Sequence, residues 1–414
     1  MYVMKKIISF IFVASLLVGS FLVLFDKEDS AYAGVVSNPI VRIDFSTTNG
    51  PQPPVSGGSV YGVAMANIGD LNDDGVNDIA VSDTYLNDWD FSSPGGLYIH
   101  FMNVDGSIIS SSVIDDSTPN GPSTLVVSAN YGSSIAGIGD LNGDGVEDIA
   151  VGASADYNGS VRSGAVYIHF MNTDGSIDST VRINNNTANG PSVITGGTFG
   201  SSVSNLGDLN GDGVQDLLVG ADSESSTGTA TGAAYILFMN TDGSLDSTVK
   251  INSLTANGPV GLLAGVKYGN SVATIGDLNN DGVTDIIVGS NRDGEAGVGS
   301  GAAYIHFMNT DASIDSTVKI NYDTLNGSLA HGNNSEYGRG LSGIGDLDND
   351  GTEDIAVISQ FYMYFHFMNP DGSIRITRDI YVGGGGQFSS LSNTSMGDID
   401  GNGVFDIIDG SNVG

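Results

Sequence analysis

The sequence has no cysteine and few basic residues. Its 414 residues include 13 Lys and Arg against 48 Asp and Glu, which gives a formal net charge of −35. The lack of cysteine excludes disulfides, thiolate metal sites and a cysteine nucleophile. The acidic balance argues against nucleic acid or an anionic membrane surface as a partner. What the chain has instead is 60 glycines and a hydrophobic share of 40%, which is that of a protein that folds.

One long apolar run is present, at the N-terminus. Lys5 and Lys6 precede an apolar stretch at 7–25, and Ala31-Tyr32-Ala33 places small residues before a cleavage point at Gly34. We therefore predict a signal peptide over residues 1–33, with an uncleaved N-terminal anchor as the alternative because nineteen residues can span a bilayer. Both readings place residues 34–414 outside the cytoplasm, secreted or at the cell surface, with membrane contact only through an uncleaved N-terminal segment.

Beyond residue 34 the sequence is a repeat. An acidic loop begins at Asp70 and recurs at Asp140, Asp208, Asp277, Asp346 and Asp398. An aromatic residue followed by glycine precedes each of the first five loops, and Phe388-Ser389 precedes the sixth. The repeats therefore start near residues 61, 131, 199, 268, 337 and 388.

Each repeat holds four short segments that are rich in Val, Ile, Tyr and Phe and bounded by turn residues. In the third repeat these segments span 199–209, 216–220, 233–239 and 247–252. Such segments are typical of strands, and four antiparallel strands repeated radially are typical of a β-propeller. We expect an all-β propeller of four-stranded antiparallel blades, with six blades favoured and seven as the alternative. Residues 40–51 match 180–191, so the last, incomplete blade would combine an N-terminal strand D with C-terminal strands A and B.

The acidic loop has the donor spacing of a calcium site. Hard cations such as Ca2+ take six to eight oxygen ligands. Side chains at loop positions 1, 3, 5 and 9 and the carbonyl of position 7 can converge when a glycine at position 6 permits a sharp turn. We predict up to six structural Ca2+ ions. Their candidate ligands are Asp70, Asn72, Asp74, Val76 and Asp78; Asp140, Asn142, Asp144, Val146 and Asp148; Asp208, Asn210, Asp212, Val214 and Asp216; Asp277, Asn279, Asp281, Val283 and Asp285; Asp346, Asp348, Asp350, Thr352 and Asp354; and Asp398, Asp400, Asn402, Val404 and Asp406.

A plain acidic turn is the alternative reading of each loop, because Asp, Asn and Gly also favour turns. Six copies at a near-constant period favour the cation site over chance. An EF-hand is excluded, because position 12 is Val81 or an equivalent valine in the first loops rather than Glu, and strands flank the loop.

The aromatic-Gly pair, the D-x-[DN]-x-D-G-x-x-D loop and the following "VGAS" (151–154) or "VGAD" (219–222) resemble the FG-GAP repeats of the integrin alpha-subunit β-propeller and its microbial relatives. The resemblance covers nearly all of residues 40–414. It implies that the loop joins strands A and B on the lower face and binds calcium. Integrins have seven such repeats with calcium in only some, and no leg domains follow here, so integrin-type signalling is not implied.

Histidine offers a second set of candidates. His100, His169, His306 and His366 share one slot in the strand motif, and the third repeat has Leu237 there. A slot that accepts leucine is a packing position, which argues against a catalytic or zinc role. His331 is the one histidine in a variable loop.

The variable loops opposite the calcium loops are the expected binding surface. They span 82–96, 153–164 and 290–301, and the first contains Tyr85 and Trp89, which we predict to bind ligand, with packing over the blade edge as the alternative. We expect an exported calcium-binding propeller without enzymatic activity that binds an extracellular protein or glycan in adhesion. A structural envelope or matrix protein is the alternative. A hydrolase or lyase is less favoured, because these loops offer Asp and Glu but almost no His.

Overall fold

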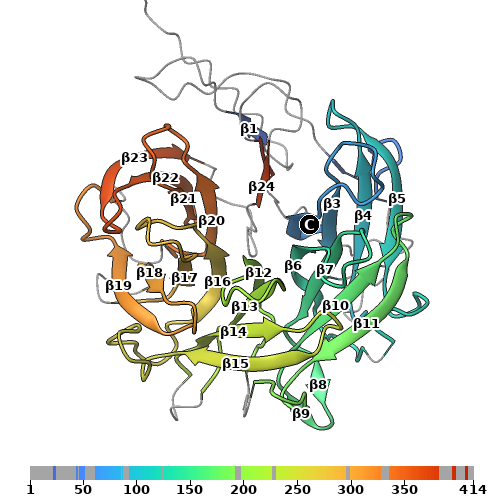
Figure 1. Ribbon diagram of the computed structural model, residues 1–414, viewed down its shortest axis with the longest axis horizontal. Helices are drawn as coiled ribbons and strands as arrows, with labels where there is room; N and C mark the ends of the chain where they lie inside the picture. The colour runs from blue at the N-terminus through green and yellow to red at the C-terminus, as the bar shows by residue number, and fades with distance from the viewer. Residues whose placement is uncertain are drawn as a thin grey trace, which may run out of the picture.

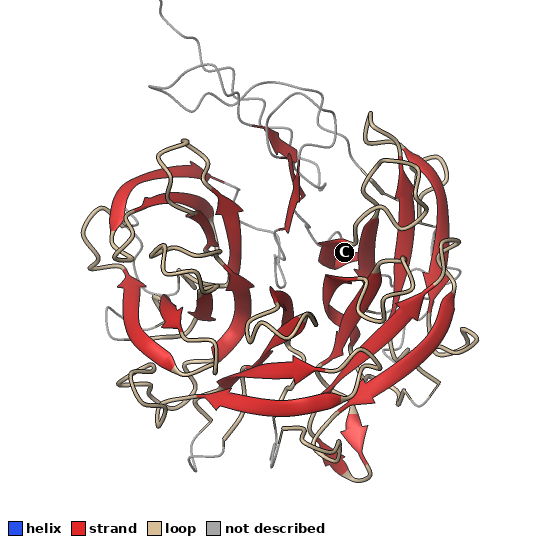
Figure 2. Cartoon of the chain, in the orientation of Figure 1, coloured by secondary structure: helices blue, strands red, loops and turns tan. Residues whose placement is uncertain are grey.

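The computed structural model describes residues 43–44, 46–51, 61–84, 86, 93–123, 125–191, 197–225, 230–294, 299–327 and 335–381, and the backbone of three strands at 22–24, 394–397 and 406–408. Every regular element in these ranges is a β-strand (Figure 2). In the same ranges, no helix has the length and apolar character that a membrane crossing requires.

Five four-stranded antiparallel sheets are arranged around a common centre as the blades of a propeller, with the first strand of each blade innermost and the last outermost (Figure 1). Their strands are β2 (Tyr61–Asn67), β3 (Ile79–Asp83), β4 (Gly96–Met102) and β5 (Ile108–Ile114) in blade 1; β6 (Tyr131–Gly139), β7 (Asp148–Ala153), β10 (Ala165–Met171) and β11 (Ile177–Ile183) in blade 2; β12 (Ser202–Gly207), β13 (Asp216–Ala221), β14 (Ala233–Met239) and β15 (Leu245–Ile251) in blade 3; β16 (Tyr268–Thr274), β17 (Ile286–Ser290), β18 (Ala302–Met308) and β19 (Ile314–Asn321) in blade 4; and β20 (Gly340–Gly345), β21 (Asp354–Ile358), β22 (Tyr362–Met368) and β23 (Ile374–Tyr381) in blade 5. We call the four strands of each blade A to D in this order. A small hairpin of β8 (Tyr157–Asn158) and β9 (Val161–Arg162) lies between strands B and C of blade 2.

The two central strands of each blade are buried on both faces, because each blade packs against a neighbour on either side. On β10, Val166 and Ile168 belong to the core shared with blade 3, whereas Tyr167 and Met171 belong to the core shared with blade 1. The period-two alternation therefore separates two hydrophobic cores rather than core from solvent. The outer strand β11 is buried at its ends, Ile177 and Ile183, and partly open between them.

The aromatic-Gly pair is a junction between blades. The backbone of Phe199 bridges to Gly164, just before strand C of the preceding blade. Gly200 has φ +83°, and a Cβ there would lie 2.4 Å from the carbonyl oxygen of Ala165, so a side chain is excluded by both conformation and space. Gly152 on strand B of blade 2 is equally constrained, because its Cβ would lie 2.1 Å from the carbonyl oxygen of Gly200. The absence of a side chain at these two glycines thus allows the two blades to approach this closely.

The last blade differs from the prediction. The described residues contain five complete blades, one fewer than the six that were favoured and two fewer than the alternative of seven. A three-stranded sheet of β24 (Thr394–Gly397), β25 (Asp406–Ile408) and β1 (Leu22–Leu24) lies between blades 5 and 1 (Figure 1). Strands A and B of this sheet come from the C-terminal repeat, as expected, but the third strand comes from within the predicted signal segment.

The N-terminal strand D that the match to 180–191 predicts stays a prediction, because residues 40–42, which correspond to strand residues 180–182, lie outside the described part of the chain. Ile43 and Asp44 are not in a strand, and 46–50 form a turn that packs on blade 1. Asn49 Nδ2 donates to the carbonyl oxygen of Ile109 at 2.9 Å. The described part of 40–51 therefore corresponds to the turn that follows strand D in 180–191, and both turns hold the next blade through an asparagine side chain.

The antiparallel order puts the loops on two opposite faces, as predicted. Asp148, at the end of the A–B loop, accepts the N–H of Met171 where strand C ends, so the A–B and C–D turns share one face, which we call the lower face. On the other, upper face, the segment leading into β16 lies between two B–C loops: Gly265 N–H donates to Ala230 O at 2.6 Å, and Arg292 N–H donates to Val266 O at 3.2 Å.

Candidate metal centre

The A–B loop of blade 2 has a geometry that the other four described A–B loops largely repeat. Gly145 has φ +90°, and its N–H donates to Asp140 Oδ2 at 2.8 Å. The N–H of Asp144 is shared by Asp140 Oδ1 at 3.0 Å and Asn142 Oδ1 at 2.8 Å. Asp144 Oδ1 in turn accepts the N–H of Val146 at 2.8 Å. Because one N–H group serves both positions 1 and 3, the side-chain oxygens of these positions lie close together inside the turn.

The backbone conformation at position 4 of the loop explains why this position, which is not a predicted ligand, is Asp, Gly or Asn in the described loops. Its φ is positive in every described loop, between 59° and 78°, at Asp73, Gly143, Gly211, Asn280 and Asn349. Only glycine and, among side-chain residues, Asn and Asp adopt this left-handed conformation readily. Asp73 is therefore present for backbone geometry, not as a fourth carboxylate of the donor set.

The aspartate at position 9 ties the loop to strand C. Asp148 is fully buried, its Oδ2 accepts the N–H of Leu141 at 3.0 Å, and its Oδ1 accepts the N–H of Met171 at 3.0 Å. The same pair of bonds is made by Asp78, Asp216, Asp285 and Asp354. The second bond joins residues about twenty positions apart in blades 1 to 4, so the loop motif alone did not predict it.

The charged form of these position-9 carboxylates is disfavoured by burial and by the neighbouring carboxylates. The pKa of Asp148 is raised to about 7, mainly by burial and to a lesser extent by the carboxylates of Asp144 and Asp140. The two hydrogen bonds from the backbone N–H groups of Met171 and Leu141 act in the opposite direction and lower this pKa. For the same causes, the pKa is raised to about 6 in Asp78, Asp216 and Asp285 and to about 7 in Asp354. Among the described residues, no Lys or Arg forms an ion pair with the loops of blades 1 to 4.

The donor set fits a hard divalent cation. It consists of oxygen atoms alone, three carboxylates and one amide in each of the first four loops, at a turn whose negative charge has no cationic partner. In blade 5, carboxylate oxygens of Asp346, Asp348 and Asp354 all lie within 4.8 Å of one another. The valines at position 7 pack their side chains against the blade cores, and Thr352 is buried, so only the main chain of this position is available to a ligand.

Several predicted residues fall outside the part of the chain that the structure describes. These are Asp398, Asp400, Asn402 and Val404 of the sixth loop, Tyr85 and Trp89 of the first variable loop, and His331. Asp406 begins β25, where only the backbone is described.

The four strand histidines are internal hydrogen-bonding residues. His169 is fully buried, with Nε2 at 2.7 Å from the Tyr131 hydroxyl and Nδ1 at 2.8 Å from Thr180 Oγ1. The Thr180 hydroxyl donates to the backbone oxygen of Asn120, in the turn that follows blade 1, at 2.6 Å. Its one proton is thus used, so Nδ1–H donates to Thr180 and Nε2 accepts from Tyr131. Burial lowers the pKa of His169 to about 3, and the ring is neutral.

This chain of four groups, which we call the relay, recurs in blades 1, 4 and 5. It is formed there by Tyr61, His100, Ser111 and Asn49; by Tyr268, His306, Thr317 and Asn257; and by Tyr337, His366, Thr377 and Asn326. In blade 3, Phe199 and Leu237 replace the tyrosine and histidine together, and Thr248 still donates to Asn189 O at 2.7 Å. Leu237 at the histidine position predicted that this position serves packing, and its burial confirms that prediction. Because Phe199 accompanies Leu237, the histidine and its tyrosine partner are replaced as a pair.

Sequence reasoning missed a set of ion pairs below the upper face. Asp156, fully buried in the B–C loop of blade 2, pairs with Arg182 on strand D at 2.6 Å and accepts the Tyr167 hydroxyl at 2.8 Å. Glu224 with Lys250 and Asp293 with Lys319 repeat the pair in blades 3 and 4, at 2.8 and 3.0 Å. The recurrence of a basic residue directly before the last isoleucine of strand D is the signal that could have found them.

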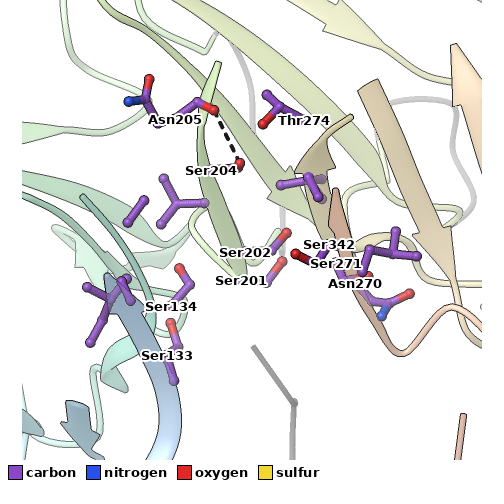
Figure 3. A pocket seen from close by; sticks show the side chains of 18 of the residues that line it. Ser133, Ser134, Ser201, Ser202, Ser204, Asn205, Asn270, Ser271, Thr274 and Ser342 are labelled. Atoms are coloured by element: carbon purple, nitrogen blue, oxygen red, sulfur yellow. Dashed lines mark hydrogen bonds between the residues drawn. The ribbon is translucent and has the colours of Figure 1, made fainter. Parts of the chain in front are cut away.

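A cavity of about 280 Å³ lies at the centre of the ring, lined by the A strands of all five blades. Its wall is rich in small polar side chains, of which Ser134, Ser202 and Ser271 are labelled in Figure 3. Each of these three hydroxyls donates to the glycine carbonyl of the next aromatic-Gly pair, at 2.9 to 3.0 Å. These hydroxyls therefore join adjacent blades.

Comparison with known proteins identifies the repeat. The FG-GAP repeat family matches residues 131–169, 199–237 and 268–306, which cover strands A to C of blades 2 to 4. Integrin alpha-3 of Cricetulus griseus is 35% identical over 168 residues, which cover 39% of this chain and 14% of that protein. Integrin alpha pat-2 of Caenorhabditis elegans is 27% identical over 254 residues, which cover 57% of this chain and 19% of that protein.

Another relative has a different activity in its name. Phosphatidylinositol-glycan-specific phospholipase D of Bos taurus is 33% identical over 199 residues, 45% of this chain and 22% of that protein. The matches thus span less than a quarter of each of these relatives. A solved structure from Lactobacillus plantarum aligns with 88% of this chain and 83% of its own, but its TM-score of 0.44 and 10% identity are too low to bear on the fold. The chain carries FG-GAP repeats and, over part of its length, is similar to integrin alpha-subunits.

Proposed function

We propose that the protein is an exported, calcium-stabilised propeller that serves as a non-enzymatic binding or adhesion module outside the cell. The observation that carries this proposal is the A–B loop, built in nearly the same way in five blades, with a buried and electrostatically frustrated aspartate at its end. A Ca2+ ion would be held by the side chains at positions 1, 3, 5 and 9 and by the carbonyl of position 7. In blades 1 to 4 the ion would supply the positive charge that the loops lack.

The upper face is the proposed binding surface. Of the twelve exposed large apolar side chains among the described residues, eight lie in segments that join strand B to C or strand D to the next strand A, which supports these segments as the contact surface. They are Val127, Tyr157, Val161, Leu254, Val260, Leu263, Tyr322 and Leu325. The ion pairs of Asp156, Glu224 and Asp293 hold the B–C loops in place beneath it. Tyr85 and Trp89, which lie outside the described residues, are the ligand contacts that we propose in the first of these loops.

An extracellular protein is the partner that the integrin similarity supports, with a glycan as the second candidate. Among the described residues, no histidine lies in the upper loops, because the four that are described are all buried on strand C. The similarity to the phospholipase keeps a hydrolase among the alternatives. Incubation of the purified protein with phosphatidylinositol-glycan substrates tests it, and turnover would overturn the non-enzymatic assignment.

The calcium proposal is tested by thermal unfolding with and without EGTA, together with metal counting. A ligand that binds only the folded state stabilises it by RT ln(1 + [L]/Kd), about 2.7 kcal/mol at one hundred times Kd for one site. We expect EGTA to lower the melting temperature by several degrees and Ca2+ to restore it, with Mg2+ as the control for ion size. An unchanged melting temperature and no bound metal would overturn the proposal.

A further inference from the structure

The loop of blade 5 differs from the other described loops at one ligand position. Asp348 stands at position 3, where the first four loops have asparagine, so all four side-chain positions are carboxylates. Two of them already have a cationic partner. Arg375 on β23 pairs with Asp348, and its Nη2 lies 2.7 Å from Asp350 Oδ2.

Arg375, like Asp348, differs in type from the corresponding residues of blades 2 to 4. Arg375 follows Ile374, which pairs with Met368 at the start of strand D, and Asp178 follows Ile177, which pairs with Met171. The corresponding residues of blades 3 and 4 are Asp246 and Asp315, both exposed. Blade 5 has thus changed two residues together, from Asn and Asp to Asp and Arg.

The two changes compensate one another in charge. Three aspartates and one asparagine give −3 at the ligand positions of loops 2 to 4, and four aspartates with Arg375 give −4 + 1 = −3 in loop 5. They also compensate in hydrogen bonding. In loop 2, Asn142 Nδ2 donates to Asp144 Oδ2 at 2.8 Å, and in loop 5 the Arg375 guanidinium makes the equivalent contact to Asp350 Oδ2.

Arg375 is further held by its own blade. Its guanidinium carbon lies 6.0 Å from the centroid of the Phe367 ring, a distance at which a cation and an aromatic face attract. An arginine that bridges two carboxylates makes charge-assisted hydrogen bonds, which are stronger than neutral ones.

We propose that Arg375 is the built-in cation of the fifth loop, and that this loop therefore keeps its shape without the divalent ion that the other loops need. The proposal rests on the proposed calcium function of the other loops. An ion entering the fifth loop would have to share Asp348 and Asp350 with the guanidinium or displace it, so this loop is the weakest calcium site among the described loops.

The test is calcium counting by equilibrium dialysis on the full chain, with four proteins compared at equal free calcium. Arg375→Gln removes the internal cation and keeps four carboxylates. Asp348→Asn with Arg375→Asp reproduces the residues of blades 2 to 4, a combination that already folds in this chain. Asp144→Asn in blade 2 is the control that weakens a loop without such an arginine. We expect one more bound ion per chain than in the parent for each of the first two variants, and one fewer for the control.

Melting in EGTA gives an independent readout. Arg375→Gln should melt several degrees below the parent in EGTA and recover in calcium, because its fifth loop has become ion-dependent. If Asp144→Asn loses an ion while neither Arg375 variant gains one, the Arg375 proposal is wrong and the calcium function stands. If the parent and Asp144→Asn alike bind no calcium, the proposed function itself fails.

Discussion

At the scale of single residues, blades 2 and 3 fill the same buried positions in two ways, with a hydrogen-bonded pair in blade 2 and an apolar pair in blade 3. Tyr131 and His169 occupy the same two places as Phe199 and Leu237, and each pair is fully buried. Neither pair leaves a polar group unpaired, and burying a polar group lowers stability mainly when its hydrogen-bond partner is missing.

This exchange predicts the behaviour of three variants. His169→Leu alone leaves the Tyr131 hydroxyl without its acceptor and should lower the free energy of unfolding by about 2 kcal/mol. Tyr131→Phe with His169→Leu copies blade 3 and should come within about 1 kcal/mol of the parent. Denaturant unfolding at pH 7.5 measures both, with Tyr131→Phe as the second single variant. A double variant that is no better than His169→Leu would show that the relay is more than a matched pair.

The relay also predicts a pH dependence. The unfolded imidazole takes up a proton near pH 6.5, but the buried ring of His169 resists protonation until about pH 3, so stability is lost as pH falls below 6.5. One such histidine costs about 1.4 kcal/mol at pH 5.5. The Tyr131→Phe/His169→Leu variant should therefore lose about 1.4 kcal/mol less than the parent between pH 8 and 5.5. Saturating calcium keeps the loop carboxylates, whose raised pKa values act in the opposite direction, out of this comparison. Equal losses would contradict the assignment of a neutral, buried ring.

At the scale of strands and loops, glycine has two different roles that one matched pair of variants can separate. Gly200 and Gly211 both have positive φ, of +83° and +77°. Only Gly200 is also crowded by a neighbouring blade, since no atom lies within 4 Å of a Cβ built at Gly211.

We expect Gly200→Ala to destabilise the protein by more than about 3 kcal/mol, because strain and a blade-to-blade clash add. Gly211→Asn, which copies Asn280 and Asn349 at the same loop position, should stay within about 0.5 kcal/mol of the parent. Thermal unfolding in calcium measures both. Similar losses in the two variants would show that backbone strain alone decides.

The limits of sequence reasoning are also set at this scale. The loops, the A-to-D strand order and the two faces could be predicted because each depends on residues close together in the sequence. The contact of Asp148 with Met171, the ion pair of Asp156 with Arg182 and the relay join segments 23 to 60 residues apart, so no local pattern names their partners. For the ion pair, only the recurring basic residue of strand D marks one of the two partners. The last sheet could not be predicted for a related reason. Its third strand, β1, has the composition of an export signal, and composition does not specify a pairing partner.

At the scale of the whole molecule, acidic residues far outnumber basic ones, and most of the described basic residues are in ion pairs. Arg182, Lys250, Lys267, Lys319, Arg339 and Arg375 are all in ion pairs with acidic side chains. The scarce positive charge of the described part is thus largely used to hold loops and strands together. Calcium in every acidic loop except that of blade 5, five ions in all, would change the formal net charge from −35 to −25, by −35 + 10.

Self-repulsion should therefore become visible when calcium is removed. In EGTA, raising KCl from about 0.05 to 0.5 M shortens the Debye length from roughly 14 to 4 Å and should raise the melting temperature. The same salt step should have a smaller effect in saturating calcium. Tetramethylammonium chloride is the control for specific ion binding. A melting temperature in EGTA that does not respond to either salt would show that charge repulsion is negligible.

The turn that ends each repeat has a consequence for how such a ring can change in length. Asn120 belongs to one repeat and the threonine that it holds, Thr180, to the next, and repeats 1 to 4 each contain both a holding asparagine and a receiving hydroxyl. A gene duplication that copies one whole repeat therefore copies both halves of a joint. The inserted blade would arrive already fitted to its two neighbours, so the number of blades can evolve by copying alone, without a new interface being invented.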